Sequence, residues 1–409
     1  MVLLKTMDTK MKKPIKVLFQ SRVELFDKRG GDTYQMECTK EAIEKLYPGF
    51  KIDIKPEIKV RNIAEYDIVN LFNIDWICET YPQARYAKRF NKPLVLSAIH
   101  HSESEILEFE DKCRFGTRRV FNTFIKKQES RDVLKNFYRS FLYPKKFYPT
   151  LLQAMIGVKN QQRQVLRMSD IVLVQTNLEI KEIIKDIGIS DFKCEKVISG
   201  VSTNVFLKTD KQAFCDYFFR KCSKKIIPSK VLMSVGRIEP RKNQLALIET
   251  FSRLRKETTD FNDWVLIFIG DSNLYHIEYN KRFNNEIENC DYIYYLGRLP
   301  QNLVSSAMSL GGIYVQTSWF ETLGLASLEA AIAGMRVVAT GARIKEYLGN
   351  YATYCDPGDI SSIKEAIMEA RKSRPLDSTA RENFIKKYTW EETAKQTVKI
   401  YKKLLAANN

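Results

Sequence analysis

The sequence of 409 residues lacks several features that would each point to a class of protein. It has no run of about eighteen apolar residues, so we expect no membrane-spanning helix, and the apolar stretch at its start is too short for a signal peptide. Its eight cysteines form no Cys-x-x-Cys pair, and only three histidines are present. We therefore expect neither a disulfide framework nor a zinc site, but the reduced thiols of a cytosolic protein.

Positive charge is what the sequence has in excess. Lys and Arg number 66 against 49 Asp and Glu, which gives a net charge of +17 and favours acidic partners such as nucleotides, nucleic acid or an anionic membrane. The excess is concentrated between residues 112 and 167, where basic residues alternate with Phe and Tyr. This mixture suits an anionic lipid surface. A solvated basic helix whose rings pack inward on their own domain fits it equally well.

Short apolar runs alternate with helical segments along most of the chain, which is typical of parallel sheets covered on both faces. We expect strands at 15–20, 52–54, 68–72, 94–99, 170–176, 231–235, 264–269, 292–296, 312–315 and 336–339. The alternation weakens around residues 202–229 and then restarts. We therefore predict an α/β protein with two doubly wound Rossmann-like domains, 1–205 and 206–387, followed by a terminal helix, 388–409.

Two glutamates, Glu321 and Glu329, flank a Gly-Leu step after an apolar run. The alanine-rich residues 327–333 predict a helix that ends at Gly334. Gly324 would let the backbone approach a ligand, and the free N–H groups of the helix start suit a phosphate. One carboxylate could then face a sugar while the other accepts hydrogen bonds from a ribose. The spacing alone also fits a surface turn followed by a core helix with incidental acids.

A second polar segment, residues 236–243, follows one expected strand and precedes a helix. Arg237 and Lys242 could converge on one diphosphate, the guanidinium as a bidentate fork and the ammonium as a point charge. Alternatively they are two exposed cations at a helix start, where they would oppose the helix dipole. An anion bound there would remove that conflict.

These two segments resemble the Glu-x7-Glu and Gly-Arg-x4-Lys motifs of retaining GT-B glycosyltransferases, most closely those of family 4, the glycosyl transferases group 1. Asn243 stands where family members usually carry glycine. Gly270 and Arg298 lie in turns that match, in order, the family's strand-end turns near the nucleotide. The resemblance implies a donor cleft between the two domains, with the acceptor on 1–205, the nucleotide sugar on 206–387 and the terminal helix crossing back to the first domain.

The resemblance extends to the first domain. Gly30 and Gly31 resemble the family's glycine loop facing the donor phosphates, and His100, rather than its neighbour His101, matches the family histidine near the sugar. The implied catalytic residues are Arg237, Lys242, Glu321 and His100, and the implied donor-binding residues are Gly30, Gly31, Gly270, Arg298, Thr322, Leu323, Gly324, Leu325 and Glu329.

The resemblance implies different roles for these residues. Arg237 and Lys242 would stabilise charge on the leaving diphosphate, Glu321 would bind hydroxyls of the donor sugar, and Glu329 would bind the ribose. No Asp-x-Asp occurs in the chain, so we expect neither a metal nor a cofactor besides the nucleotide-diphosphate sugar as co-substrate.

The basic, aromatic segment 112–167 favours a class of acceptor and a location. The acceptor would be a glycan or lipid-linked molecule of capsule, O-antigen or lipopolysaccharide synthesis, handled in the cytoplasm or on the inner face of the plasma membrane through residues 112–167, without nucleic acid. Three other functions stay open: a GT-B-shaped sugar-nucleotide epimerase or phosphorylase, a basic nucleic-acid-binding protein whose affinity falls steeply with salt, and a catalytically silent binding subunit.

Overall fold

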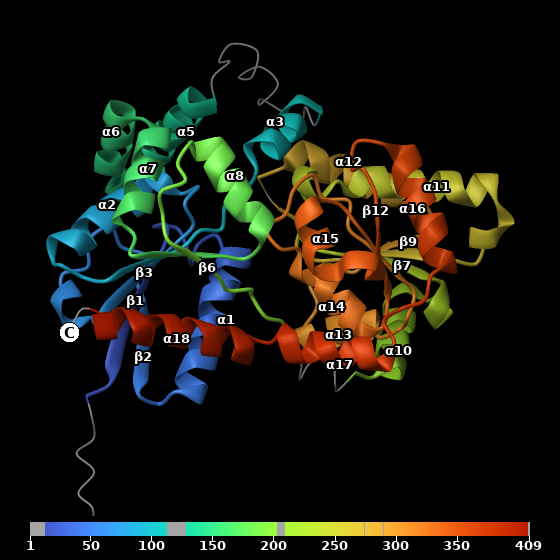
Figure 1. The fold of residues 1–409 in the computed structure, drawn as a ribbon. Coiled ribbons are helices and arrows are strands. Elements are labelled where there is room, and N and C mark those ends of the chain that lie inside the picture. The colour runs from blue at the N-terminus through green and yellow to red at the C-terminus, as the bar shows by residue number, and fades with distance from the viewer. Residues whose placement is uncertain (1–12, 113–127, 203–208, 274, 289, 408–409) are drawn as a thin grey trace, which may run out of the picture.

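The computed structural model describes residues 13–112, 128–202, 209–273, 275–288 and 290–407, which form two α/β domains side by side (Figure 1). Each domain has a six-stranded sheet in which every described pair of strands is parallel. The predicted fold class is therefore confirmed. The predicted boundary between residues 205 and 206 lies outside the described residues.

The first sheet has the strand order β2-β1-β3-β4-β5-β6. Its strands are β1 (Ile15–Gln20), β2 (Phe50–Ile54), β3 (Ile68–Phe72), β4 (Leu94–Ser97), β5 (Ile171–Val174) and β6 (Cys194–Lys196). The helices of this domain are α1 (Gly31–Leu46), α2 (Ile77–Arg89), α3 (Glu103–Lys112), α5 (Gln128–Leu142), α6 (Phe147–Ile156), α7 (Val158–Met168) and α8 (Asn177–Ile187), with 3-10 turns η1 (Ile63–Glu65) and η2 (Pro144–Lys146). Every residue of the central strands β3, β4 and β5 is buried, as the apolar runs predict for a sheet covered on both faces.

The second sheet has the order β12-β11-β10-β7-β8-β9. Its strands are β7 (Val231–Val235), β8 (Val265–Ile269), β9 (Ile293–Tyr295), β10 (Ile313–Val315), β11 (Arg336–Ala339) and β12 (Ala352–Tyr354). Its helices are α10 (Lys211–Cys222), α11 (Gln244–Glu257), α12 (Ile277–Glu288), α13 (Gln301–Met308), α14 (Leu325–Ala333), α15 (Ala342–Leu348), α16 (Ile360–Lys372) and α17 (Ser378–Lys387), with 3-10 turns η3 (Pro228–Lys230), η4 (Pro240–Lys242), η5 (Thr259–Phe261) and η6 (Gly349–Tyr351). The edge strand β12 was not predicted, because its three half-buried residues form no apolar run.

In each sheet the strand order has a switch point, where successive strands stop being added on one side and are added on the other. Ligands of doubly wound sheets bind at the carboxyl ends of the two strands that flank this point. In the second sheet this point lies between β7 and β10, and in the first between β1 and β3. The loops after β7 and β10 carry the two polar segments found in the sequence. The topology therefore explains why segments so far apart in the chain come together.

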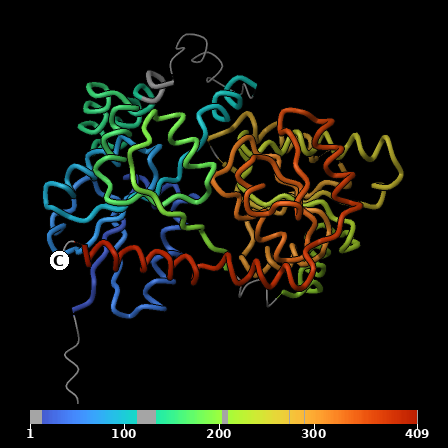
Figure 2. Tube along the Cα trace, in the orientation of Figure 1, coloured from blue at the N-terminus to red at the C-terminus, as the bar shows by residue number. Residues whose placement is uncertain are grey.

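The terminal helix α18 (Trp390–Ala407) leaves the second domain and runs along the first, beside α1 (Figures 1 and 2). Its Trp390 and Tyr401 are buried in the core formed with β1 and α1, and the Tyr401 hydroxyl accepts a hydrogen bond from Asn70 Nδ2 at 3.0 Å. Where α18 begins, it passes the interdomain linker so closely that a Cβ at Gly200 would lie 2.1 Å from the Thr389 carbonyl carbon. The chain thus passes between the domains twice, at the linker around Gly200 and at the start of α18, and the two segments lie against each other.

A second contact between the domains is polar. Arg343 of α15 is buried and donates hydrogen bonds to the His100 carbonyl oxygen and to Glu182. Glu346, one turn later, accepts hydrogen bonds from the backbone N–H groups of Asn177 at 2.9 Å and Leu178 at 3.1 Å. A carboxylate of the second domain therefore caps the start of α8 in the first domain, where the helix dipole favours negative charge.

Candidate active site

The loops after β7 and β10 bring Lys242 and Glu321 into direct contact. The Lys242 ammonium is ion-paired with Glu321 Oε1, and Arg241 Nη1 lies 3.5 Å from Glu321 Oε2. Gly236, at φ 154°, turns the chain at the end of β7, and Asn243, at φ 55°, ends the 3-10 turn that carries both cations. The structure thus joins the two sequence segments in one cluster, which we call the Lys242–Glu321 cluster (Lys242, Arg241 and Glu321).

Arg237, the other predicted cation, lies at the solvent side of this cluster. Its Nη2 is 3.6 Å from Glu239 Oε1, and the Arg241 guanidinium is 3.0 Å from the same oxygen. Arg237, Arg241 and Lys242 therefore face the two carboxylates of Glu239 and Glu321, which leaves one net positive charge (3 − 2 = 1). This net positive charge, together with the half-exposed guanidinium of Arg237, is suited to binding an anionic ligand.

Arg241 is a functional candidate that the sequence analysis missed. Besides its contacts with both carboxylates, it donates a hydrogen bond to the Phe320 carbonyl oxygen at 3.1 Å and lies 5.4 Å from the centre of the Phe320 ring. It thereby fixes the loop that presents Glu321. Its position next to Lys242 in the sequence was the available signal.

The charge state of Glu321 follows from these neighbours. Burial alone would raise the pKa of this carboxyl, but Lys242 and Arg241 outweigh burial and lower the pKa to about 2. Glu321 is therefore ionised at neutral pH. An ionised carboxylate can accept hydrogen bonds from hydroxyl groups such as those of a sugar.

Gly324 and Tyr347 hold the loop between Glu321 and α14. Gly324 has φ 65°, and a Cβ at this position would lie 2.7 Å from Ile344 Cδ1, so the turn requires glycine. The Tyr347 hydroxyl donates to the carbonyl oxygens of Leu323 and Gly324. These carbonyls are thus turned towards the protein, and the first N–H groups of α14 have no helical partner.

The second glutamate, Glu329, occupies a different environment. It is buried within α14, and burial raises its pKa to about 7. No hydrogen-bond partner of its side chain is found among the described residues. Its charge acts on Tyr34 of α1 in the other domain, whose pKa is raised mainly by burial and further by Glu329. Glu329 therefore lies where α14 meets the first domain.

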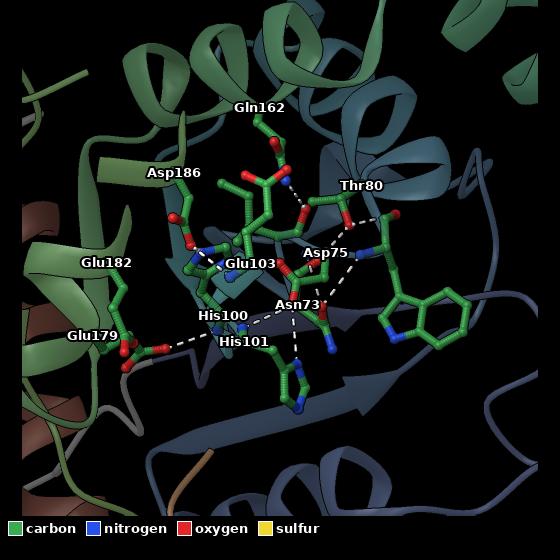
Figure 3. Close-up of polar contacts among 12 residues, drawn as sticks. Asn73, Asp75, Thr80, His100, His101, Glu103, Gln162, Glu179, Glu182 and Asp186 are labelled. Carbon is green, nitrogen blue, oxygen red and sulfur yellow. Dashed lines mark hydrogen bonds and ion pairs between the residues drawn. The ribbon is translucent and has the colours of Figure 1, made fainter. Parts of the chain in front are cut away.

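The two adjacent histidines after β4 face different surroundings (Figure 3). His100 is buried, and its ring nitrogens lie 2.7 Å from Asp75 Oδ1 and 3.0 Å from Asp186 Oδ2. Burial lowers the pKa of His100, but the two carboxylates outweigh it and raise the pKa to about 10. His100 is thus a buried imidazolium with both ring nitrogens occupied, and in this arrangement it offers none to a sugar.

His101, the neighbour of the predicted His100, contacts the loop that carries Glu321, and the sugar contact predicted for His100 stays a prediction. His101 Nδ1 lies 3.0 Å from Asp75 Oδ2, and the His101 ring packs edge-on against Phe320, with centres 5.3 Å apart. Phe320 directly precedes Glu321. The histidine that reaches the Lys242–Glu321 cluster is therefore His101, with Asp75 fixing its ring.

The glycines of the other predicted turns have distinct surroundings. Gly30 and Gly31 form the start of α1, and a Cβ at Gly31 would meet no atom within 4 Å. At Gly270, with φ 146°, a Cβ would lie 2.1 Å from the Gly236 carbonyl oxygen, so this glycine is needed for two strand ends to pack. Its role towards a ligand stays a prediction.

The remaining predicted donor-binding residues differ in their exposure to solvent. Arg298 is exposed, with Nη1 3.5 Å from Asp271 Oδ2. Thr322 is half-buried and Leu323 buried, while Leu325 packs against the cores of both domains. Their roles in donor binding also stay predictions. Among the described residues, no group of three or more His, Cys, Asp or Glu side chains is arranged to hold a metal ion.

Residues 219–387, which contain this cluster and Glu329, match the family model described as Glycosyl transferases group 1. Over these residues the chain is similar to the glycosyl transferases group 1 family. The family resemblance expected from the sequence motifs is thereby confirmed. The matched residues cover β7 to α17, so they include both loops at the switch point of the second sheet.

Curated relatives match part of the chain. O-antigen chain mannosyltransferase B of Escherichia coli is 27% identical over 42% of this chain and 45% of its own length. D-inositol 3-phosphate glycosyltransferase of Kribbella flavida is 24% identical over 59% of this chain and 58% of its own length. The matches thus span about half the length of these relatives.

Solved structures match the whole fold. Sucrose-phosphate synthase from Thermosynechococcus elongatus superposes with a TM-score of 0.69 at 13% identity, covering 96% of this chain and 100% of that chain. HepE of Anabaena, solved in complex with UDP, gives a TM-score of 0.66 at 14% identity, covering 95% and 100%. With the two Rossmann-like domains and the returning α18, these likenesses identify the fold as GT-B.

Proposed function

We propose that the chain is a retaining glycosyltransferase that moves a sugar from a nucleotide-diphosphate sugar to a hydroxyl of a glycan or lipid-linked acceptor. The observation that carries this proposal is the Lys242–Glu321 cluster at the switch point of the second sheet, beside the start of α14. It combines surplus positive charge for a diphosphate with an ionised carboxylate for sugar hydroxyls. The similarity to the group 1 family and the glycosyltransferase names of the relatives agree with it.

In the proposed reaction, Arg237 and Lys242 neutralise charge on the leaving diphosphate, aided by the N–H groups at the start of α14. The bond between the anomeric carbon and the phosphate oxygen breaks, and the acceptor oxygen bonds the same face of that carbon. The proton of the acceptor hydroxyl passes to the leaving phosphate. Glu321 holds donor hydroxyls, Glu329 the ribose, and His101 the sugar face towards the first domain.

We further propose that charge neutralisation by side chains makes a bound metal unnecessary. Because the solved HepE structure holds UDP, UDP-sugars come first among the donors to test, followed by GDP- and ADP-sugars. The O-antigen enzyme among the relatives supports a role in cell-envelope polysaccharide synthesis, with the protein in the cytoplasm at the inner face of the plasma membrane. No described helix has the length and apolarity needed to cross a bilayer.

The test is a thermal-shift screen of the full chain against a panel of nucleotide sugars, followed by mass spectrometry of any stabilising donor with candidate acceptors. We expect one donor class to raise the Tm and to yield a glycosylated acceptor. Conversion of a donor into its epimer without an acceptor would instead support the epimerase. Salt-sensitive binding of nucleic acid with no effect of any nucleotide sugar would support the nucleic-acid-binding protein.

A further inference from the structure

The antiparallel helices α5 and α6, with the turn η2 between them, form a hairpin at the outer corner of the first domain (Figure 1). Its sequence lies within the basic, aromatic residues 112–167, of which 113–127 fall outside the described residues. Phe137 and Tyr143 are half-buried, but the rings of Tyr138, Phe141, Phe147 and Tyr148 are exposed and do not pack inward on their own domain. Phe141 is 83% exposed and Met155 is 78% exposed.

The exposed apolar side chains are ordered along both helices. On α5, Leu134, Tyr138 and Phe141 follow one another at helical spacing, and on α6 so do Phe147, Leu151 and Met155; all six are exposed. Residues three or four positions apart share one face of a helix. The hairpin therefore presents a continuous apolar stripe on each helix to the outside.

The interface between the two helices is polar. Asn136 Nδ2 donates to Gln153 Oε1 at 2.8 Å, and the hydroxyls of Ser140 and Thr150 lie 3.0 Å apart. Soluble helices normally bury the apolar face and expose the polar one. In this hairpin Val133 and Ile156 pack against the core of the domain, but each helix also carries a second, outward apolar stripe, which is the arrangement expected of helices whose outer face meets lipid.

The hairpin is anchored so that it cannot turn its apolar face inward without breaking buried ion pairs. Lys146 of η2 has no exposed surface, and its ammonium is ion-paired with Glu24 and lies 2.6 Å from Glu79 Oε1. Separating a buried ion pair leaves uncompensated charges and is strongly destabilising. The outward direction of the stripe is thus built into the domain.

The inner side of the hairpin contacts the loop after β3 and lies near a residue of the second domain. The Arg139 guanidinium lies 4.9 Å from the centre of the Trp76 ring, next to Asp75, which holds His101. Lys28 lies 5.7 Å from the Tyr143 ring of the hairpin and 4.8 Å from the Tyr275 ring of the second domain. The hairpin that carries the outer stripe is therefore in contact, on its inner side, with the loop whose Asp75 holds His101.

We propose that the α5–η2–α6 hairpin is a monotopic membrane-binding element that seats its apolar stripe in a bilayer with anionic headgroups. Positive charge at the hairpin favours an anionic bilayer as the partner. Lys145 is exposed at the turn, the Lys59 ammonium lies 5.6 Å from the centre of the Tyr148 ring, and the net charge of the whole chain is +17. Cations and aromatic rings beside an apolar face bind anionic lipid. A second copy of the same basic chain would be repelled at this face. The element would hold the protein at the membrane that carries the proposed lipid-linked acceptor, and in that sense it rests on the proposed function.

The test is flotation of the full chain with vesicles of equal parts phosphatidylcholine and phosphatidylglycerol. The double variant Phe141→Ser/Met155→Ser removes two side chains that contact lipid but no core. A matched control, Ile277→Ser, alters a side chain that is 77% exposed on α12 of the other domain. We expect the wild type and the control to float and the double variant to partition at least about tenfold more weakly, since each lost side chain removes apolar burial. Lys145→Glu should weaken binding to these vesicles and leave binding to pure phosphatidylcholine unchanged.

Equal flotation of the double variant and the wild type, or no flotation of the wild type, would overturn the proposal. A wild type that self-associates without floating, and a double variant that becomes monomeric, would assign the stripe to a second copy instead. Flotation requires no transferase activity, so its outcome is independent of the donor screen. Nucleotide binding by the double variant should equal that of the wild type, because none of the altered side chains belongs to the Lys242–Glu321 cluster.

Discussion

Replacement of Glu321 by glutamine changes the charge of the Lys242–Glu321 cluster while keeping the shape of the side chain. The pKa of Glu321 lies at about 2, against an ordinary value of 4.5. A lowered carboxyl pKa adds stability that is fully present above the unfolded-state pKa and is lost as the pH falls towards the folded-state pKa. The difference corresponds to about 3 kcal/mol at neutral pH, lost between about pH 4.5 and pH 2.

We therefore expect Glu321→Gln to lower the free energy of unfolding by up to about 3 kcal/mol at pH 7. The variant should also lose the part of the acid dependence that Glu321 supplies. Turnover with the true donor should fall by about ten- to a hundredfold, the value of a hydrogen bond to a charged group. Binding of a nucleoside diphosphate should instead stay equal or tighten, because Lys242 and Arg241 lose their carboxylate and the surplus positive charge grows.

The assays are urea unfolding at several pH values, donor turnover by mass spectrometry, and calorimetric titration of the nucleoside diphosphate. The control is Glu249→Gln on the exposed face of α11, where Glu249 pairs with Arg253 at 2.6 Å and where the pair contributes about 0.5 kcal/mol at most. A Glu321→Gln variant with wild-type stability and turnover would refute the reasoning. So would a marked loss of nucleoside diphosphate affinity.

The remaining predictions concern Glu329, the histidines and metal. Burial raises the pKa of Glu329 to about 7, so ionisation of this carboxyl lowers the free energy of unfolding as the pH rises from about 4.5 to 7. We therefore expect Glu329→Gln to stabilise the ligand-free protein at pH 8 by up to about 3 kcal/mol. The same variant should bind nucleotide more weakly. His100→Ala leaves Asp75 and Asp186 without their cation and should cost about 3 to 5 kcal/mol of unfolding free energy. His101→Ala should leave stability within about 1 kcal/mol of the wild type and lower turnover. Treatment with EDTA should leave donor turnover unchanged.

Each of these outcomes has a contrary result. Equal stability of Glu329→Gln and the wild type at pH 8 would show that Glu329 carries no burial penalty. A stable His100→Ala protein with lost turnover, together with an active His101→Ala protein, would return the sugar contact to His100. Loss of turnover in EDTA that Mg²⁺ restores would contradict neutralisation by side chains alone.

Much of the fold follows from patterns that need no tertiary information. The strands at the sheet centres are continuous apolar runs, and the structure places β1, β3, β7 and β11 at the predicted residues. Gly334 ends α14 in the left-handed conformation, at φ 96°, as a glycine after an alanine-rich helix predicts. The edge strand β12 was not predicted from the sequence, because a strand at the edge of a sheet does not need a fully apolar sequence.

The site was only partly predictable because side-chain direction depends on tertiary turns. Lys242 and Glu321 were found because strand ends of a doubly wound sheet meet at one edge. Ile99 adopts φ 46°, which is costly for a β-branched residue, so the directions of His100 and His101 are set by a turn that no strand pattern predicts. The carboxylates that hold His100 come from the loop after β3 (Asp75) and from the end of α8 (Asp186), and nothing in their local sequence marks them.

The most direct test of the central claim is calorimetric titration of UDP, GDP and ADP into the wild type and into Lys242→Met. If the loops after β7 and β10 form a diphosphate site, at least one nucleotide binds the wild type, and the variant binds it at least about tenfold more weakly because a charge-assisted contact is lost. Equal binding by the variant, or binding of none of the three nucleotides by the wild type, would contradict the claim.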